Sequence, residues 1–210
     1  TRYGLEPMAR VLILFAHPAL EKSRVHRRLL REVPGLTGIT FNDLYEHYPD
    51  FNIDVPREQA LLLEHDLLIL QHPMFWYSTP AILKQWLDLV LEHGWAYGSQ
   101  GNMLHGKRVL SLVTTGGGAM AYQHEGYNRF TMREFLLPVE QSFRLCKMVV
   151  LPPYMIHGTH QMTLASIEQI AVQYRRLLEL LRDDRIDINT LIDQPTLNVA
   201  LGARLEHEDR

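Results

Sequence analysis

Three short stretches carry side chains suited to holding a planar ligand that bears a phosphate. They run from His17 to Ser23, from His72 to Ser78 and from Thr114 to Gly118. Ser23 opens an expected helix, so its hydroxyl and the unpaired N–H groups of the first turn suit a phosphate. The second stretch offers an apolar wall for a ring, and the glycines of the third let backbone N–H groups approach a ligand's polar edge. Together they describe a site for flavin mononucleotide (FMN).

Each stretch also has an ordinary structural interpretation. A serine at a helix start is usually only a cap, and a triple glycine is most often a turn. The consecutive aromatic side chains Phe75, Trp76 and Tyr77 can equally form a core cluster or a dimer contact. Their shared position after expected strands favours the ligand interpretation, because open α/β sheets bind ligands at the carboxyl ends of their strands.

Alternating apolar runs and helical patterns predict the scaffold. Strands are expected at 11–16, 38–44, 67–70, 107–114 and 148–151, the last halted by Pro152-Pro153. Helices are expected at 23–33, 57–64, 81–92, 128–143 (kinked or divided at Pro138) and 164–181. This alternation indicates an α/β, doubly wound five-stranded parallel sheet with helices on both faces. Residues 1–185 are expected to form one domain, and residues 186–210, which lose periodicity, an appended tail.

Composition narrows the class of protein. The 210 residues are 46% hydrophobic and 21% charged, which is ordinary for a single globular domain. A net charge of −3 gives no argument for nucleic acid as a partner. The single cysteine, Cys146, excludes an internal disulfide and fits a reducing compartment. No apolar run approaches the roughly 18 residues that cross a bilayer, so a cytoplasmic protein is expected, held at a membrane only through a protein partner.

Several motif matches are rejected. The stretch 101–108 nearly matches a nucleotide phosphate loop, but Arg108 replaces the Ser/Thr that holds magnesium and the stretch leads into a strand. His157 and His160 have metal-like spacing without a nearby carboxylate or thiol, so no metal is expected. No Gly-x-Gly-x-x-Gly follows the first strand, so a nicotinamide donor is expected to visit a bound flavin. No Gly-x-Ser-x-Gly elbow supports a serine hydrolase.

Longer motifs carry a resemblance to a known family. Ala16-His-Pro18 with Ser23, Gln71-His-Pro-Met-Phe-Trp-Tyr-Ser78 and Thr114-Thr-Gly-Gly-Gly118 resemble the flavodoxin-like NAD(P)H:quinone oxidoreductases. Three further stretches, 48–54, 93–98 and 104–107, are similar to the ancillary proteins of glutathione-regulated potassium-efflux (Kef) systems. The resemblance runs from about residue 10 to residue 185 and implies a flavodoxin-like sheet of strand order 2-1-3-4-5.

The resemblance also implies an activity. Its members transfer hydride in two steps, from NAD(P)H to FMN (FAD is less expected) and then to a quinone-type acceptor, and they form homodimers. Kef ancillary proteins dock on the cytoplasmic side of a potassium-efflux antiporter, so a regulatory module with a structural or sensory flavin is the alternative function.

The resemblance also implies site residues. Tyr122 and His124 are the nearest matches to a catalytic Tyr and His that follow the Thr-Thr-Gly-Gly loop in DT-diaphorase. Family members often have Asn in place of His26. The implied cofactor-binding residues are His17, Ser23, Arg24, Val25, His26, Pro73, Met74, Phe75, Trp76, Tyr77, Thr114, Thr115, Gly116 and Gly117.

Overall fold

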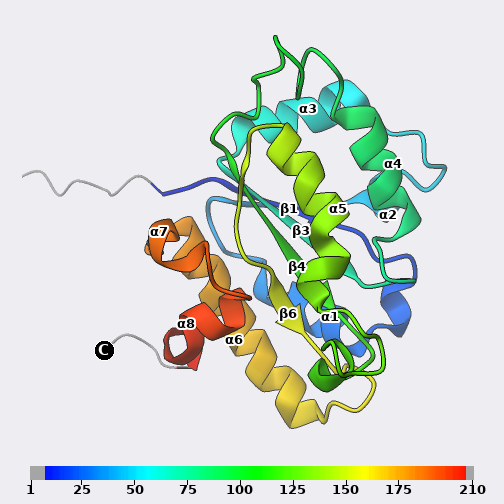
Figure 1. Cartoon of the computed structure of the whole chain (residues 1–210), viewed down its shortest axis with the longest axis vertical. Coiled ribbons are helices and arrows are strands. Elements are labelled where there is room, and N and C mark those ends of the chain that lie inside the picture. The colour runs from blue at the N-terminus through cyan, green and yellow to red at the C-terminus, as the bar shows by residue number, and fades with distance from the viewer. Residues whose placement is uncertain (1–7, 207–210) are drawn as a thin grey trace, which may run out of the picture.

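A parallel β-sheet with strand order β2-β1-β3-β4-β5 forms the centre of the protein (Figure 1). The computed structural model describes residues 8–206. Every strand pairing is parallel, which confirms the predicted doubly wound fold and its strand order. The strands are β1 (Val11–Phe15), β2 (Ile39–Asp43), β3 (Leu67–Pro73), β4 (Arg108–Thr114), β5 (Val149–Val150) and β6 (Tyr154–Ile156).

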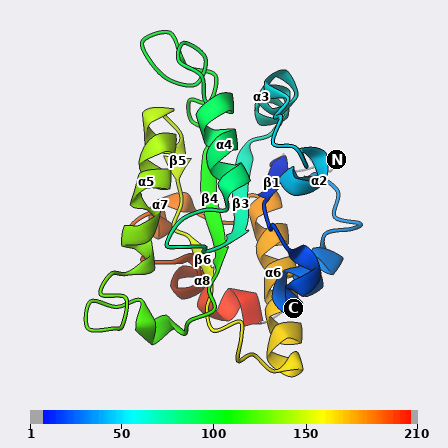
Figure 2. The ribbon, with the colours of Figure 1, turned by 90° about the vertical axis from the view of Figure 1, so that its right-hand side faces the viewer.

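Helices cover both faces of the sheet, and Figure 2 shows α5 and α6 on opposite sides. Alternating strand residues divide between two cores: Ile13 faces a cluster that contains Tyr174 of α6, and Leu14 faces a cluster that contains Trp86 of α4. None of the helices within residues 8–206 is long and apolar enough to cross a bilayer. The helices are α1 (Arg24–Leu29), α2 (Leu44–His47), α3 (Val55–Glu64), α4 (Ala81–Val90), α5 (Met132–Leu145), α6 (Leu164–Arg182), α7 (Ile188–Leu191) and α8 (Leu197–Glu206).

The fifth strand ends before the proline pair, as predicted, and a short sixth strand that was not predicted follows the prolines. β5 pairs with the start of β4, and β6 pairs with its end, where Tyr154 lies opposite Leu112. Prolines lack the N–H that a ladder needs, but a strand at the edge of a sheet tolerates them. The chain therefore returns to β4 after the interruption, and the residues that follow Ile156 reach the carboxyl end of the sheet.

Helix α5 begins later than predicted and runs as one helix through Pro138. Its start is set by a capping box, in which Thr131 Oγ1 accepts from the Glu134 N–H and the Glu134 carboxylate accepts from the Thr131 N–H. Residues 128–130 belong to the preceding loop.

The segment expected as an appended tail packs onto the domain. Leu197 and Leu201 of α8 are buried in the same core cluster as α6, and Figure 1 shows α7 and α8 beside α6. The Asn198 side chain accepts from the Met155 N–H at 2.8 Å and donates to the Met155 carbonyl at 2.9 Å, which covers the exposed edge of β6. Two short helices, with non-helical geometry at Gly202, give no single apolar stripe for a sequence pattern to reveal.

Candidate cofactor site at the carboxyl ends of the strands

A cavity of about 500 Å³ opens at the carboxyl ends of β1, β3 and β4. All three predicted stretches contribute to its walls, although the chain separates them by dozens of residues. The predicted residues that line it are His17, Ser23, Arg24, Pro73, Met74, Phe75, Thr114 and Gly116. Ala19 and Lys22 also line it and belong to the predicted stretch from His17 to Ser23, although they were not named as cofactor-binding residues, whereas Thr159 and His160 lie outside all three predicted stretches.

The first wall combines a capped helix start with two cationic side chains. Ser23 Oγ accepts from the His26 N–H at 3.1 Å, which confirms the predicted N-cap of α1. Because α1 has only six residues, its dipole is a weak attraction for an anion. Lys22 and Arg24 supply full positive charges at the cavity wall, and the Arg24 guanidinium donates to the Met162 carbonyl at 3.1 Å. This wall suits a phosphate group.

The second wall is a tight turn that follows β3. Phe75 and Ser78 exchange both backbone hydrogen bonds at 3.0 Å, with Trp76 at φ 48° and Tyr77 at φ 61° between them. Positive φ at both central positions is the geometry of a type I′ turn, and for bulky residues it is strained. Trp76 is 94% exposed, and neither Trp76 nor Tyr77 lines the cavity. Within one chain the apolar part of this wall therefore consists of Pro73, Met74 and Phe75, and the structure does not bring Trp76 and Tyr77 to it.

The third wall contains a glycine that a neighbouring histidine requires. A Cβ at Gly116 would lie 2.4 Å from His160 Nε2, closer than any real contact, so the His160 imidazole packs directly on the glycine backbone. Thr115, which is buried, and Gly117, which is exposed, do not line the cavity. Thr115 Oγ1 donates to the Gly117 carbonyl at 2.8 Å and accepts from His157 Nδ1 at 2.9 Å.

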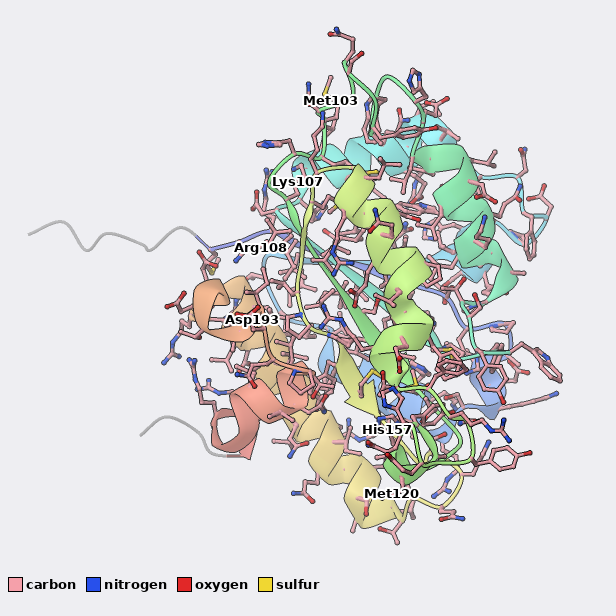
Figure 3. The ribbon with its side chains drawn as sticks, viewed as in Figure 1. Met103, Lys107, Arg108, Met120, His157 and Asp193 are labelled. Carbon is pink, nitrogen blue, oxygen red and sulfur yellow. The ribbon has the colours of Figure 1, made fainter. Side chains whose placement is uncertain are left out.

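Both histidines of the rejected metal motif therefore belong to the site or its support. Burial lowers the pKa of His157, which favours its neutral form, and His160 lines the cavity. Figure 3 shows His157 at the end of the molecule that also carries Met120, opposite Met103. Among residues 8–206, no group of three or more His, Cys, Asp or Glu side chains is placed to hold a metal. The spacing of the two histidines did not predict a position at the cavity, because they are brought there by the pairing of β6 with β4.

Two predicted cofactor residues lie behind the first wall. Val25 and His26 are buried and do not line the cavity. Burial, together with the neighbouring His17 and His72, lowers the pKa of His26 to about 3. Its Nε2 lies 3.0 Å from Thr114 Oγ1, so the His26 imidazole is joined to the cavity wall by a side-chain hydrogen bond through that threonine.

The predicted catalytic pair lies outside the cavity lining. The Tyr122 ring packs against the rings of His157, at 5.5 Å between centroids, and Phe135. His124 is largely exposed, and its Nε2 lies 2.9 Å from the Glu134 carboxylate. Tyr122 thus contacts His157, which is hydrogen-bonded to Thr115 behind the third wall, and the structure does not bring His124 to the cavity.

A family model described as a flavodoxin-like fold matches residues 9–178. The chain belongs to this flavodoxin-like family. It is 44% identical over 166 residues to the glutathione-regulated potassium-efflux system ancillary protein KefG of Escherichia coli, covering 79% of this chain and 90% of KefG.

Two solved structures of this flavodoxin-like type are also similar. One is the general stress protein 14 of Treponema denticola in complex with FMN, with a TM-score of 0.78 and 37% identity over 82% of this chain and 99% of that one. The other is the NADPH-quinone reductase of P. pentosaceus, with a TM-score of 0.73 and 31% identity over 80% of this chain and 96% of that one.

Proposed function

We propose that this protein is an FMN-dependent NAD(P)H:quinone oxidoreductase. The observation that carries the proposal is the cavity, which joins cations, an apolar wall and a bare glycine at the carboxyl ends of three strands. Similarity to an FMN complex and to an NADPH-quinone reductase supports the same function. FMN, when bound, supplies the two-electron hydride chemistry.

The chain's own residues have binding and positioning tasks in this proposal. Lys22, Ser23 and Arg24 hold the phosphate, and Met74 and Phe75 cover the ring. We propose FMN in preference to FAD, because the three walls are assigned to one phosphate and one ring. None of them is assigned to the adenosine monophosphate that FAD adds. NAD(P)H is the proposed donor, and a quinone-type electrophile the proposed acceptor.

A titration of the purified protein with FMN, followed by flavin fluorescence, tests cofactor binding. Arg24→Gln is expected to raise the FMN dissociation constant about three- to thirtyfold, because a charge-assisted contact is lost. Arg27→Gln is the matched control, since Arg27 lies one helical turn away and does not line the cavity. Stopped-flow mixing with NADH, NADPH and then a quinone tests turnover. Wild-type protein that takes up no FMN would contradict the proposal.

Tyr122 and His124 stay our proposed catalytic residues. Tyr122→Phe and His124→Ala are expected to lower kcat while FMN affinity is kept, because neither side chain lines the cavity. An unchanged kcat and pH profile in both variants would remove this assignment.

A homodimer is proposed from the apolar side chains exposed around the site. Trp76, Tyr127 and Met120 are 94%, 90% and 79% exposed, in two loops next to the cavity. Such a surface is characteristic of protein–protein contacts. Trp76→Ala is expected to weaken self-association at least tenfold in analytical ultracentrifugation. Val172→Ala, an exposed apolar position on α6, should leave it unchanged.

A second candidate function is regulation of a potassium-efflux antiporter, with the protein held at the cytoplasmic face of the inner membrane by that partner. The 44% identity to KefG favours it. Co-purification with the antiporter and stimulation of potassium efflux would support this role. An Arg24→Gln protein that keeps efflux stimulation after losing FMN would separate regulation from catalysis.

A further inference from the structure

We propose that Tyr174, Gln71 and His26 form a one-way hydrogen-bond chain that fixes the Thr114 hydroxyl as a donor into the cavity. The three are positioning residues, since only Thr114 borders the cavity. The binding part of this inference rests on the proposed FMN site, whereas the direction of the chain can be measured without any ligand.

The chain joins four elements through buried side chains. Tyr174 on α6 donates to Gln71 Oε1 on β3 at 2.8 Å, and Gln71 Nε2 lies 3.4 Å from His26 Nδ1 on α1. His26 Nε2 lies 3.0 Å from Thr114 Oγ1 at the end of β4. Each of the four residues is at most 5% exposed, so water does not compete along the way.

Simple valence rules set the direction. A phenol that donates to the amide oxygen leaves the Gln71 NH₂ group facing His26 Nδ1, and an amide NH₂ can only donate. Nδ1 of His26 must then carry a lone pair, which places the single proton of the neutral ring on Nε2. That N–H donates to Thr114 Oγ1, so the threonine's own proton must go elsewhere.

The reversed chain is disfavoured at its Tyr174 end, and a charged His26 is disfavoured as well. If Gln71 were flipped, the Tyr174 hydroxyl would receive a hydrogen bond and its proton would have no acceptor, because Gln71 is its only partner within residues 8–206. A doubly protonated His26 would place an N–H against the Gln71 NH₂ group. Burial holds the pKa of His26 near 3, so the ring stays neutral at working pH.

Thr114 is thereby left with one free donor at the cavity wall. Its hydroxyl gives no hydrogen bond to another residue of the described range. A ligand atom placed there must be an acceptor, such as a carbonyl oxygen, an unprotonated ring nitrogen or an anionic oxygen. A ligand N–H at the same place would leave two donors facing each other, which a buried site penalises.

The direction is tested first in the protein without added ligand. Long-range ¹H–¹⁵N NMR of the imidazoles is expected to show His26 as the neutral Nε2–H tautomer between pH 5 and pH 8. In Tyr174→Phe, which frees the Gln71 amide to rotate, the Nδ1–H tautomer is expected to become populated. A wild-type His26 that is Nδ1–H, or charged at pH 6, would overturn the proposal.

The consequence is tested by FMN affinity. Thr114→Val, which keeps the shape and removes the hydroxyl, is expected to raise the dissociation constant about three- to tenfold, and Thr114→Ser to restore it. Tyr174→Phe should raise it in the same direction by less. Tyr154→Phe, an equally buried tyrosine of the same core cluster, is the control and should stay within twofold of wild type.

These outcomes separate the two proposals. Wild-type affinity in both Thr114→Val and Tyr174→Phe would overturn the donor role while leaving the FMN site intact. A wild-type protein that binds no FMN would remove the proposed function, and the NMR tautomer would still decide the direction of the chain. Should Tyr174→Phe fail to fold, the Thr114→Val and Thr114→Ser pair still decides the donor role.

Discussion

Two buried polar networks lie on opposite faces of the sheet, and they end differently. On one face the carboxylate of Glu58, which is fully buried, accepts from Asn42 Nδ2, the Tyr48 hydroxyl and Trp86 Nε1, and forms an ion pair with Arg57. Every partner is a donor, and only Arg57 is partly exposed to solvent. This network is closed, and it locks β2, α3, α4 and the loop between α2 and α3 together.

The chain from Tyr174 to Thr114 on the other face is open. It is built from neutral groups, and its last hydroxyl has a donor to spare at a cavity wall. A polar network that satisfies itself contributes to the fold, because breaking it leaves a buried group unpaired. A network that keeps one group unsatisfied at a cavity contributes to binding.

The largest expected effect comes from breaking the closed network. Glu58→Ala should lower the free energy of unfolding by about 3–5 kcal/mol, because Arg57 and the buried donors lose their common acceptor. Urea denaturation measures the change, with the exposed Glu64→Ala on the same helix as the control. FMN affinity of the folded fraction should stay at the wild-type value. A stable variant with impaired FMN binding would reverse the roles assigned to the two networks.

Acid should act mainly through two buried histidines, His26 of the open network and His72 of β3. Burial lowers the pKa of His26 to about 3 and that of His72 to about 4, against an ordinary value near 6.5. The unfolded chain therefore binds more protons below pH 6.5, so stability is full above that value and falls as the pH drops toward 4. The expected loss is about 1.4 kcal/mol per pH unit for each histidine.

Urea unfolding measured between pH 7.5 and pH 5 tests this expectation. Wild-type protein should lose about 3–4 kcal/mol over the range. His26→Asn should show a clearly shallower slope than wild type, since the contribution of His26 is lost while His72, His157 and His17 still titrate. Equal slopes for the two proteins would show that His26 keeps an ordinary pKa.

The walls of the cavity at which the open network ends could be predicted from the sequence only in part. β1, β3 and β4 were recognisable because each contains a mainly apolar run, and each of the three predicted stretches that follow them contributes residues to the cavity wall. His160 and Thr159 were missed, since only the return of β6 after Pro152-Pro153 brings them to the cavity.

Neither network could be predicted from local pattern. Glu58 resembles any acidic residue in the first turn of a short helix, and its burial depends on Trp86, 28 positions away. Tyr174 meets Gln71 across 103 positions. Such contacts follow from sheet topology, and residue spacing along the chain does not contain them. The exposure of Trp76 was missed for a related reason. The direction of its side chain is set by positive φ values at Trp76 and Tyr77, and three consecutive aromatic residues do not predict such a backbone.

A smaller effect than the loss of either buried network is expected at the cavity wall itself. Gly116→Ala should displace the His160 imidazole, whose Nε2 would lie 2.4 Å from the new Cβ, at a strain of about 1–2 kcal/mol. Because a side chain at the end of a loop can rotate away, unfolding stability should fall little, whereas FMN affinity should fall about five- to twentyfold as the imidazole enters the cavity or leaves its wall. Gly118→Ala is the matched control in the same triple glycine, because a Cβ there meets nothing within 4 Å. Equal affinities in the two variants would show that His160 is only a neighbour of the binding surface, and the third wall would then consist of the Thr114–Gly116 backbone alone.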